Sequence, residues 1–112
     1  MIRQRLIDMR VYVASSVDGE IVGTIASSIA GQEAHLRGMA VNPAWQGLGI
    51  AEQLLLTAEK DLLACGCTRV NLDTTIPLQR AIRFYQKNGF VPTGRISDFF
   101  GMPLHEFSKP FR

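Results

Sequence analysis

The chain has 112 residues, a length that suits one domain with a single hydrophobic core. Its 46% of hydrophobic and 20% of charged residues are ordinary for a folded globular protein and exclude a disordered one. The net charge of +2 gives no case for a nucleic acid partner, and no run approaches the roughly 20 apolar residues of a membrane span. We therefore expect one cytoplasmic domain over residues 1–112 that binds neither nucleic acid nor membrane.

The first part of the chain predicts three strands. Apolar residues alternate with polar ones from 10 to 17 and again from 20 to 29, where Ile21, Gly23, Ile25 and Ser27 share one side. Asp18-Gly19 between these runs is a strong hairpin signal, because both turn residues must adopt positive φ. Gly31 then turns the chain into a third strand over 33–41, and we assign no structure to residues 1–8.

The third strand carries an irregularity in its apolar pattern. Leu36, Met39 and Val41 are the residues expected to face inward, but the step from 36 to 39 is three residues instead of two. One extra residue at Arg37-Gly38 restores the alternation, and glycine tolerates such a bulge. The sequence therefore predicts a strand that bends away from its next neighbour.

A glycine-bearing loop follows this strand and leads into a helix. Asn42-Pro43 ends the strand, because proline has no amide to donate to a sheet. Gly47 and Gly49 allow a sharp turn that directs the amides of residues 46–51 into one concavity, where the helix dipole favours a phosphate. The helix is predicted over 48–64, with an apolar stripe of Ile50, Leu54, Leu55, Ala58, Leu62 and Leu63.

The remaining elements follow from turn residues and periodicity. Gly66 ends the first helix, and the strand after this crossover should run parallel to the third strand. The second helix ends at Asn88-Gly89, and Pro103 marks the last strand as an edge strand. The expected elements are, in order, a strand over 69–73, a helix whose cap and first turn are residues 74–77, and strands over 90–95 and 98–107.

The two cysteines, Cys65 and Cys67, flank a single glycine. A metal site would need further ligands at partner spacing, and His35 and His105 lie far away in the sequence. A disulfide between the two thiols would close a very tight ring. We expect small packing residues here and no metal.

Three kinds of phosphate-binding loop could follow a strand in this way. A nucleoside triphosphate loop needs Gly-Lys-Ser/Thr, and the chain contains no Gly-Lys pair. The dinucleotide fingerprint requires Gly or Ala where this chain has Glu52. The remaining pattern, Gln46-Gly-Leu-Gly-Ile-Ala51, resembles the coenzyme A diphosphate motif of the GCN5-related N-acetyltransferases (GNATs), with Gln46, Gly49 and Ala51 at its fixed positions.

A second block supports this resemblance. Ala81-Ile-Arg-Phe-Tyr-Gln-Lys-Asn-Gly-Phe90 is similar to a later motif of the same family, and the two blocks stand in the family's order. The resemblance extends from about Arg10 to Phe107 and implies a mixed α/β (α+β) fold. Such a fold has a mostly antiparallel sheet of six to seven strands with one splayed parallel pair, and two main helices.

The resemblance also implies a cofactor, acetyl-coenzyme A, and the residues that hold it. The pantetheine arm would lie in the gap of the splayed pair, beside the backbone of Met39 and Val41. Many relatives carry Asn where this chain has Leu78, and Thr74 or Thr75 would substitute for it. The diphosphate would lie on the loop and first helical turn, formed by Gln46, Gly47, Leu48, Gly49, Ile50 and Ala51.

The implied reaction is transfer of the acetyl group to a primary amine by direct attack. Tyr85 matches the family's tyrosine, a general acid for the departing thiolate, although its position alone favours a core aromatic on the apolar helix face. Glu33 and His35, at the start of the bulged strand, are candidates for the base that acts on the amine. The alternative is that both are hydrophilic residues at a strand end.

Family members normally begin with one strand and two helices that build much of the amine site, whereas this chain starts at about the second strand. Its first strand would then be a bare edge, which favours a homodimer. Two main functions remain open: an acetyl-coenzyme A dependent N-acetyltransferase of unknown acceptor, or an inactive module that binds acyl-coenzyme A or serves as a partner subunit. A third possibility is another phosphorylated ligand on the loop.

Overall fold

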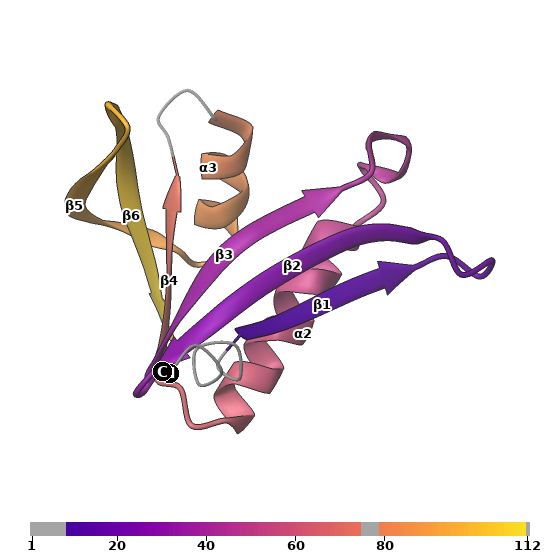
Figure 1. Cartoon of the computed structure of the whole chain (residues 1–112), viewed down its shortest axis with the longest axis horizontal. Coiled ribbons are helices and arrows are strands. Elements are labelled where there is room, and N and C mark those ends of the chain that lie inside the picture. Colours follow the sequence, from indigo (N-terminus) through magenta and orange to yellow (C-terminus); the bar gives the residue numbers. More distant parts are fainter. Residues whose placement is uncertain (1–8, 75–78, 112) are drawn as a thin grey trace.

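The computed structural model describes residues 9–74 and 79–111, which form one mixed sheet and its helices (Figure 1). The strands are β1 (Met9–Ser15), β2 (Ile21–Ala30), β3 (Glu33–Val41), β4 (Arg69–Thr74), β5 (Val91–Phe99) and β6 (Met102–Pro110). The helices are the short 3-10 helix η1 (Pro43–Trp45), α2 (Ile50–Ala64) and α3 (Gln79–Lys87). The six strands lie in the order β1-β2-β3-β4-β6-β5.

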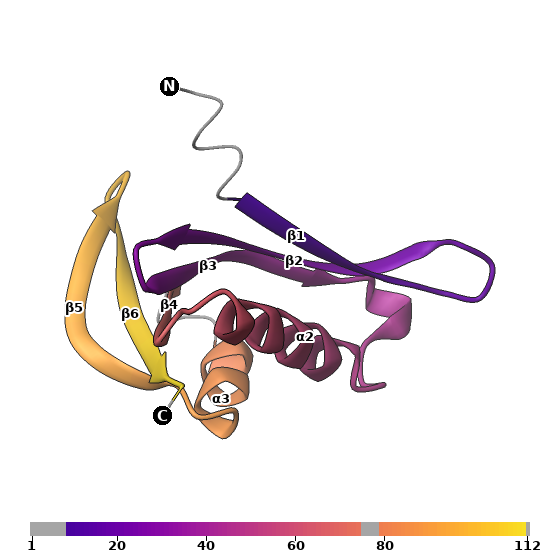
Figure 2. The same cartoon turned by 90° about the horizontal axis from the view of Figure 1, so that it is seen from below.

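Among the strands of the described residues, β3 and β4 alone pair in parallel, and the other neighbouring strands are antiparallel. The predicted fold class, a mostly antiparallel sheet with one parallel pair and two main helices, is therefore confirmed. Figure 2 shows α2 and α3 on the same side of the sheet, and no described helix covers the other side. The core lies between the sheet and α2, where Ile25, Leu55, Leu62, Val70 and Phe90 are fully buried.

The valines of β1 lie on the side of the strand that faces away from α2. Val11 and Val13 are exposed, at 63% and 52%, while Tyr12 and Ala14 pack against the core. The Tyr12 hydroxyl donates to the carboxylate of Asp61 on α2, and this contact holds the strand with its aromatic side inward. Polar contacts with α2 therefore fix the facing, and the valines lie on the open side of the sheet.

The side assignment of β2 is right for Gly23, Ile25 and Ser27 but wrong for Ile21, which is exposed. The register between β1 and β2 shifts here: Ala14 pairs with Gly23, and the next residue, Ser15, pairs with Ile21. Val22 is thus an extra residue in β2. One extra residue turns the side chains that precede it in the strand to the opposite face of the sheet, so Ile21 is exposed.

The helix α2 begins at Ile50, two residues later than predicted, because Gly49 takes the left-handed conformation and stands before the first helical turn. Leu54, Leu55, Ala58 and Leu62 are buried as expected, but Leu63 is 52% exposed. Leu63 lies about 100° further around the helix than Leu62, which takes it out of the buried arc.

The predicted bulge and splay are both present. On one side, β3 pairs with β2 through a register shift at which Arg37 is the extra residue. On the other side, the described pairs of β3 with β4 run from Glu33 opposite Arg69 to Leu36 opposite Leu72 and stop there. Beyond these pairs the two strands diverge, and Figure 1 shows α3 in the opening between them. We call this opening the fork.

The last strand is not an edge strand, contrary to the prediction. β6 lies between β4 and β5, so that β1 and β5 are the edges of the sheet that the described residues form. Among the described residues, Pro103 pairs with Asp98 of β5 and not with β4, whose pairing with β6 begins at His105, so the missing proline amide is tolerated. β5 is also longer than predicted and reaches Phe99.

The end of α3 is confirmed, since Gly89 has φ of +97° two residues after Lys87. The predicted start of this helix is only partly testable. Thr74 is the last residue of β4 instead of a helix cap, and residues 75–78 lie outside the described part of the chain, as do residues 1–8.

Candidate active site

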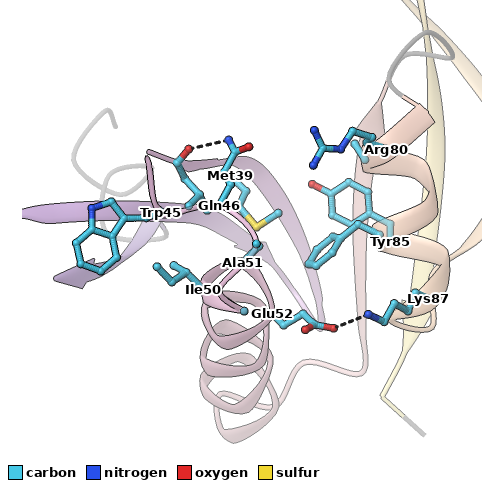
Figure 3. Close-up of a pocket in the computed structure, with 14 residues that line it drawn as sticks. Met39, Trp45, Gln46, Ile50, Ala51, Glu52, Arg80, Tyr85 and Lys87 are labelled. Atoms are coloured by element: carbon cyan, nitrogen blue, oxygen red, sulfur yellow. Dashed lines mark hydrogen bonds and ion pairs between the residues drawn. The ribbon is translucent and has the colours of Figure 1, made fainter. Parts of the chain in front are cut away.

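A cavity of about 450 Å³ lies between the fork, the loop before α2 and one face of α3 (Figure 3). Its walls come from three segments that are far apart in the sequence. Most residues predicted to bind the cofactor line it, namely Met39, Val41, Gln46, Gly47, Gly49, Ile50 and Ala51, and Tyr85 joins them from α3. The fold therefore brings both sequence blocks to one cavity.

The loop offers this cavity a series of backbone amides. Gly47 and Gly49 have φ of +82° and +81°, and an added Cβ would meet nothing within 4 Å, so the backbone angle is what requires glycine. The amides of residues 47–52 donate no hydrogen bond to any residue in the described part of the chain. Together with the positive end of the α2 dipole, they form a site suited to an anion.

The Gln46 side chain holds the loop against the end of β3. Its Nε2 donates to the Val41 carbonyl at 3.1 Å. Asn42 supports the same turn, because its Oδ1 accepts from the amide of Ala44 at 2.9 Å and caps η1. Gln46 therefore positions the amides of the loop, and the Val41 carbonyl is already occupied.

Tyr85 is half-buried on the α3 wall of the cavity. Its ring makes edge contacts with Phe84 and Phe90, at centroid distances of 5.5 and 5.7 Å. Figure 3 shows Tyr85 and Met39 pointing toward one another from opposite walls. Burial raises the pKa of the Tyr85 phenol, so the group is protonated at neutral pH. Its hydroxyl makes no hydrogen bond to a described residue and is free to donate to a ligand.

Charged side chains frame the mouth of the cavity. Lys87 Nζ, in the last turn of α3, lies 3.4 Å from Glu52 Oε2 in the first turn of α2 (Figure 3). Arg80 lines the cavity from the first turn of α3 and has no ion-pair partner among the described residues. The two cations and the free amides outweigh the one carboxylate and favour an anionic ligand.

The predicted candidates for the base lie on the open face of the sheet, outside this cavity. His35 Nε2 is 3.3 Å from Asp73 Oδ2, and Asn71 Nδ2 donates to Glu33 Oε1 at 3.0 Å. Asp73 is the first residue of β4 beyond its last pair with β3. The His35–Asp73 pair therefore stands at the vertex of the fork, where the two strands separate.

Two other predicted site residues also lie outside the cavity. Leu48 is exposed and does not belong to the lining, although its neighbours in the loop do. Thr74 is 7% exposed and pairs with His105 of β6, which leaves its side chain buried in the sheet.

A family model described as the acetyltransferase (GNAT) family matches residues 3–90. That span contains the fork, the loop and both helices. The chain belongs to the acetyltransferase (GNAT) family. The resemblance carried by the two sequence blocks is therefore confirmed.

Several solved structures share the GNAT fold of this chain. Nourseothricin acetyltransferase has a TM-score of 0.84 and 24% identity, over 94% of this chain and 66% of that one. PaiA N-acetyltransferase from Thermoplasma acidophilum, in complex with coenzyme A, has a TM-score of 0.80 and 25% identity, over 98% and 66%. An acetyltransferase from Bacillus cereus ATCC 14579 has a TM-score of 0.80 and 24% identity, over 92% and 73%. The chain thus spans about two thirds of the length of the first two.

Two further properties bear on what this GNAT chain can bind. None of its described helices is long and apolar enough to cross a membrane. Among the same described residues, no group of three or more His, Cys, Asp or Glu side chains is placed to hold a metal ion.

Sequence reasoning missed the charged residues of the site. Arg80 and Lys87 flank Phe84 at helical spacing, a signal that a helical projection of α3 would have revealed. The sequence contains no such signal for the contact of Asp73 with His35. This contact depends on the parallel register of two strands joined through a helix, which local patterns do not specify.

Proposed function

We propose that the chain is an N-acetyltransferase that moves the acetyl group of acetyl-coenzyme A to a primary amine. The observation that supports this proposal is the row of amides over residues 47–52, which donate to no described residue and belong to a loop that lines a cavity beside the fork. Family membership and the coenzyme A bound to PaiA N-acetyltransferase support the same ligand. The diphosphate would bind the amides, and Arg80 and Lys87 would add positive charge.

In this proposal, the pantetheine arm lies in the fork between β3 and β4. Beyond Leu36, the β4 side of β3 has no strand partner among the described residues, so the backbone of Met39 is open to an extended ligand. The arm would pass between the strands, and its acetyl end would lie near the vertex. Leu48 would then contribute its backbone amide alone, because its side chain is exposed.

The reaction requires a neutral amine and a leaving thiol. Deprotonation of an alkylammonium with a pKa near 10.4 costs about 4.6 kcal/mol at pH 7. The nitrogen then attacks the thioester carbonyl, the C–S bond breaks, and Tyr85 donates its phenolic proton to the sulfur. Much of the remaining acceleration would come from holding amine and thioester together.

We assign His35 as the base and Asp73 as the residue that positions its ring, because their 3.3 Å contact stands at the vertex. Glu33 is the weaker candidate, since Asn71 already occupies its carboxylate. His35→Gln should lower turnover with the amine while leaving coenzyme A binding unchanged. Full turnover in this variant would remove the assignment.

The second candidate function is a module that binds acyl-coenzyme A without transferring the acyl group. It is favoured by the packing of Tyr85 against Phe84 and Phe90, which suits a core aromatic as well as an acid. One experiment separates the two functions. Thiol release from acetyl-coenzyme A is followed across a panel of amines, and binding of coenzyme A is measured by calorimetry on the same protein. Binding with amine-dependent thiol release supports the enzyme, and binding without release supports the module.

We further propose a cytoplasmic homodimer. β1 is an edge strand whose Val11 and Val13 are exposed, and a second β1 could pair with it across a two-fold axis. The free thiols of Cys65 and Cys67 suit a reducing compartment.

A further inference from the structure

A second cavity, of about 260 Å³, lies on the open face of the sheet. Three adjacent strands supply its lining: Asp73 from β4, Glu106 from β6, and Arg95 and Ser97 from β5. Asp73 and Glu106 are direct partners in the antiparallel pair of β4 and β6. Since Asp73 also contacts His35, this cavity adjoins the vertex of the fork.

An irregularity of β5 brings Arg95 to this cavity. Pro92 pairs with Phe107 and Ile96 with His105, so four steps along β5 match two steps along β6. The extra residues include Gly94, which has φ of +88°. Bulges of this kind redirect side chains and are common beside active sites.

Hydrogen bonds hold the bulge against the acidic side of the cavity. The Thr93 hydroxyl donates to Glu106 Oε1 at 2.9 Å and accepts from the Arg95 amide at 3.2 Å. The guanidinium of Arg95 forms no ion pair with any residue in the described part of the chain. The cavity therefore presents two carboxylates and one uncompensated guanidinium.

We propose that the acceptor of the transfer is a small primary amine that also carries a carboxylate. Its ammonium would lie between Asp73 and Glu106, and its carboxylate would bind Arg95 through paired hydrogen bonds. A cavity of about 260 Å³ has room for a ligand of the size of an amino acid. The inference rests on the proposed function and names its substrate class.

The reaction then balances within the site. His35 takes one proton from the ammonium, and the neutral nitrogen forms a bond with the acetyl carbon. The C–S bond breaks and the sulfur receives the proton of Tyr85. The amide loses its remaining extra proton to solvent, His35 releases the proton that it took from the ammonium to solvent, and solvent restores the proton of Tyr85.

A binding experiment tests the substrate class independently of turnover. Three four-carbon amines, γ-aminobutyrate, butylamine and putrescine, are titrated by NMR into the full chain saturated with coenzyme A. We expect γ-aminobutyrate to bind at least about 10-fold more tightly than butylamine, because only its carboxylate reaches the guanidinium. Equal binding of the two, no binding of γ-aminobutyrate, or tighter binding of putrescine would overturn the proposal.

Variants of Arg95 test whether its guanidinium causes the preference for γ-aminobutyrate. Arg95→Gln should remove the preference for γ-aminobutyrate over butylamine, and Arg95→Lys should keep part of it. Arg83→Gln is the matched control, since Arg83 is exposed on α3 and lines neither cavity. A preference that persists in Arg95→Gln contradicts the assignment. Thiol release with the same amines tests the proposed function separately. Turnover of all three amines without preference would contradict only the proposed substrate class. Selective binding without turnover would contradict only the proposed transfer reaction.

Discussion

Tyr85 can serve as an acid only if its phenol keeps its proton and reaches the ligand. Burial raises its pKa, and its ring lies on the cavity wall. Tyr85→Phe keeps the ring contacts and removes the proton, so we predict a fall in kcat of about 100-fold with unchanged affinity for coenzyme A. Steady-state kinetics and calorimetry measure the two quantities.

The chain contains a matched control for this variant. Its other tyrosine, Tyr12, lies on β1 and contacts α2, away from both cavities. Tyr12→Phe should leave kcat unchanged at neutral pH. If both variants lose activity alike, or if Tyr85→Phe keeps full turnover, Tyr85 is not the acid.

Tyr12 itself predicts a pH dependence of stability. Burial, and then its hydrogen bond to Asp61, raise the pKa of Tyr12 from 10.0 to about 12. A raised pKa means that folding favours the protonated phenol, so this stabilisation is complete below pH 10 and is lost as pH rises toward 12.

The free energy of unfolding should therefore fall more steeply between pH 10 and 12 in the wild type than in Tyr12→Phe. Urea unfolding at several pH values measures both slopes. Parallel slopes would show that this phenol does not titrate abnormally.

At the scale of single residues, the sequence predicts the glycines of the loop from a local pattern, but it does not predict the contact of His35 with Asp73. Gly47 and Gly49 are required by local backbone angles, so a short motif was enough to identify them. His35 was a candidate from its place on the strand, but its partner Asp73 depends on register between strands. Contacts of that kind are decided by the tertiary fold.

The packing of α2 on β2 rests on a close approach at Gly23. A Cβ at this position would lie 3.1 Å from Leu54 Cδ1, 3.2 Å from Ile50 Cγ2 and 3.3 Å from the Ala40 carbonyl oxygen. We predict that Gly23→Ala lowers the free energy of unfolding by about 1–3 kcal/mol, because the helix must shift away from the sheet.

Gly38 provides the comparison for this variant. Its φ is not left-handed, and an added Cβ would meet nothing within 4 Å. Gly38→Ala should therefore change the free energy of unfolding by less than about 1 kcal/mol. Urea unfolding of both variants checks the pair, and equal destabilisation would contradict the packing described for α2.

At the scale of elements, the strands and helices could be predicted from the sequence. The neighbours of a strand in the sheet, and the side that it turns toward the core, could not all be predicted. Pro103 predicted an edge strand, whereas β6 lies between β4 and β5, and Pro103 precedes the first pair of β6 with the described part of β4. The alternation in β1 predicted a strand without assigning its inward side, and the contact of Tyr12 with Asp61 determines the facing. Both features arise from partners that are distant in the sequence.

At the scale of the whole molecule, the edge strand β1 predicts a homodimer. If β1 pairs with a second β1, the mass in solution will be twice the 12.4 kDa of one chain. Light scattering at working concentration measures this mass. A monomeric mass would contradict the proposed dimer. Val13→Lys should weaken a genuine pairing of two β1 strands, because it places a charge at the edge of the sheet.

The cofactor site is the central claim, and one NMR titration tests it most directly. Coenzyme A is added to the uniformly nitrogen-labelled chain, and amide shifts are followed residue by residue. We predict that the largest changes occur at Gly47, Gly49 and Ala51, with further changes at Met39 on the fork. Unchanged amides at these positions, whether coenzyme A binds elsewhere or not at all, would contradict the account.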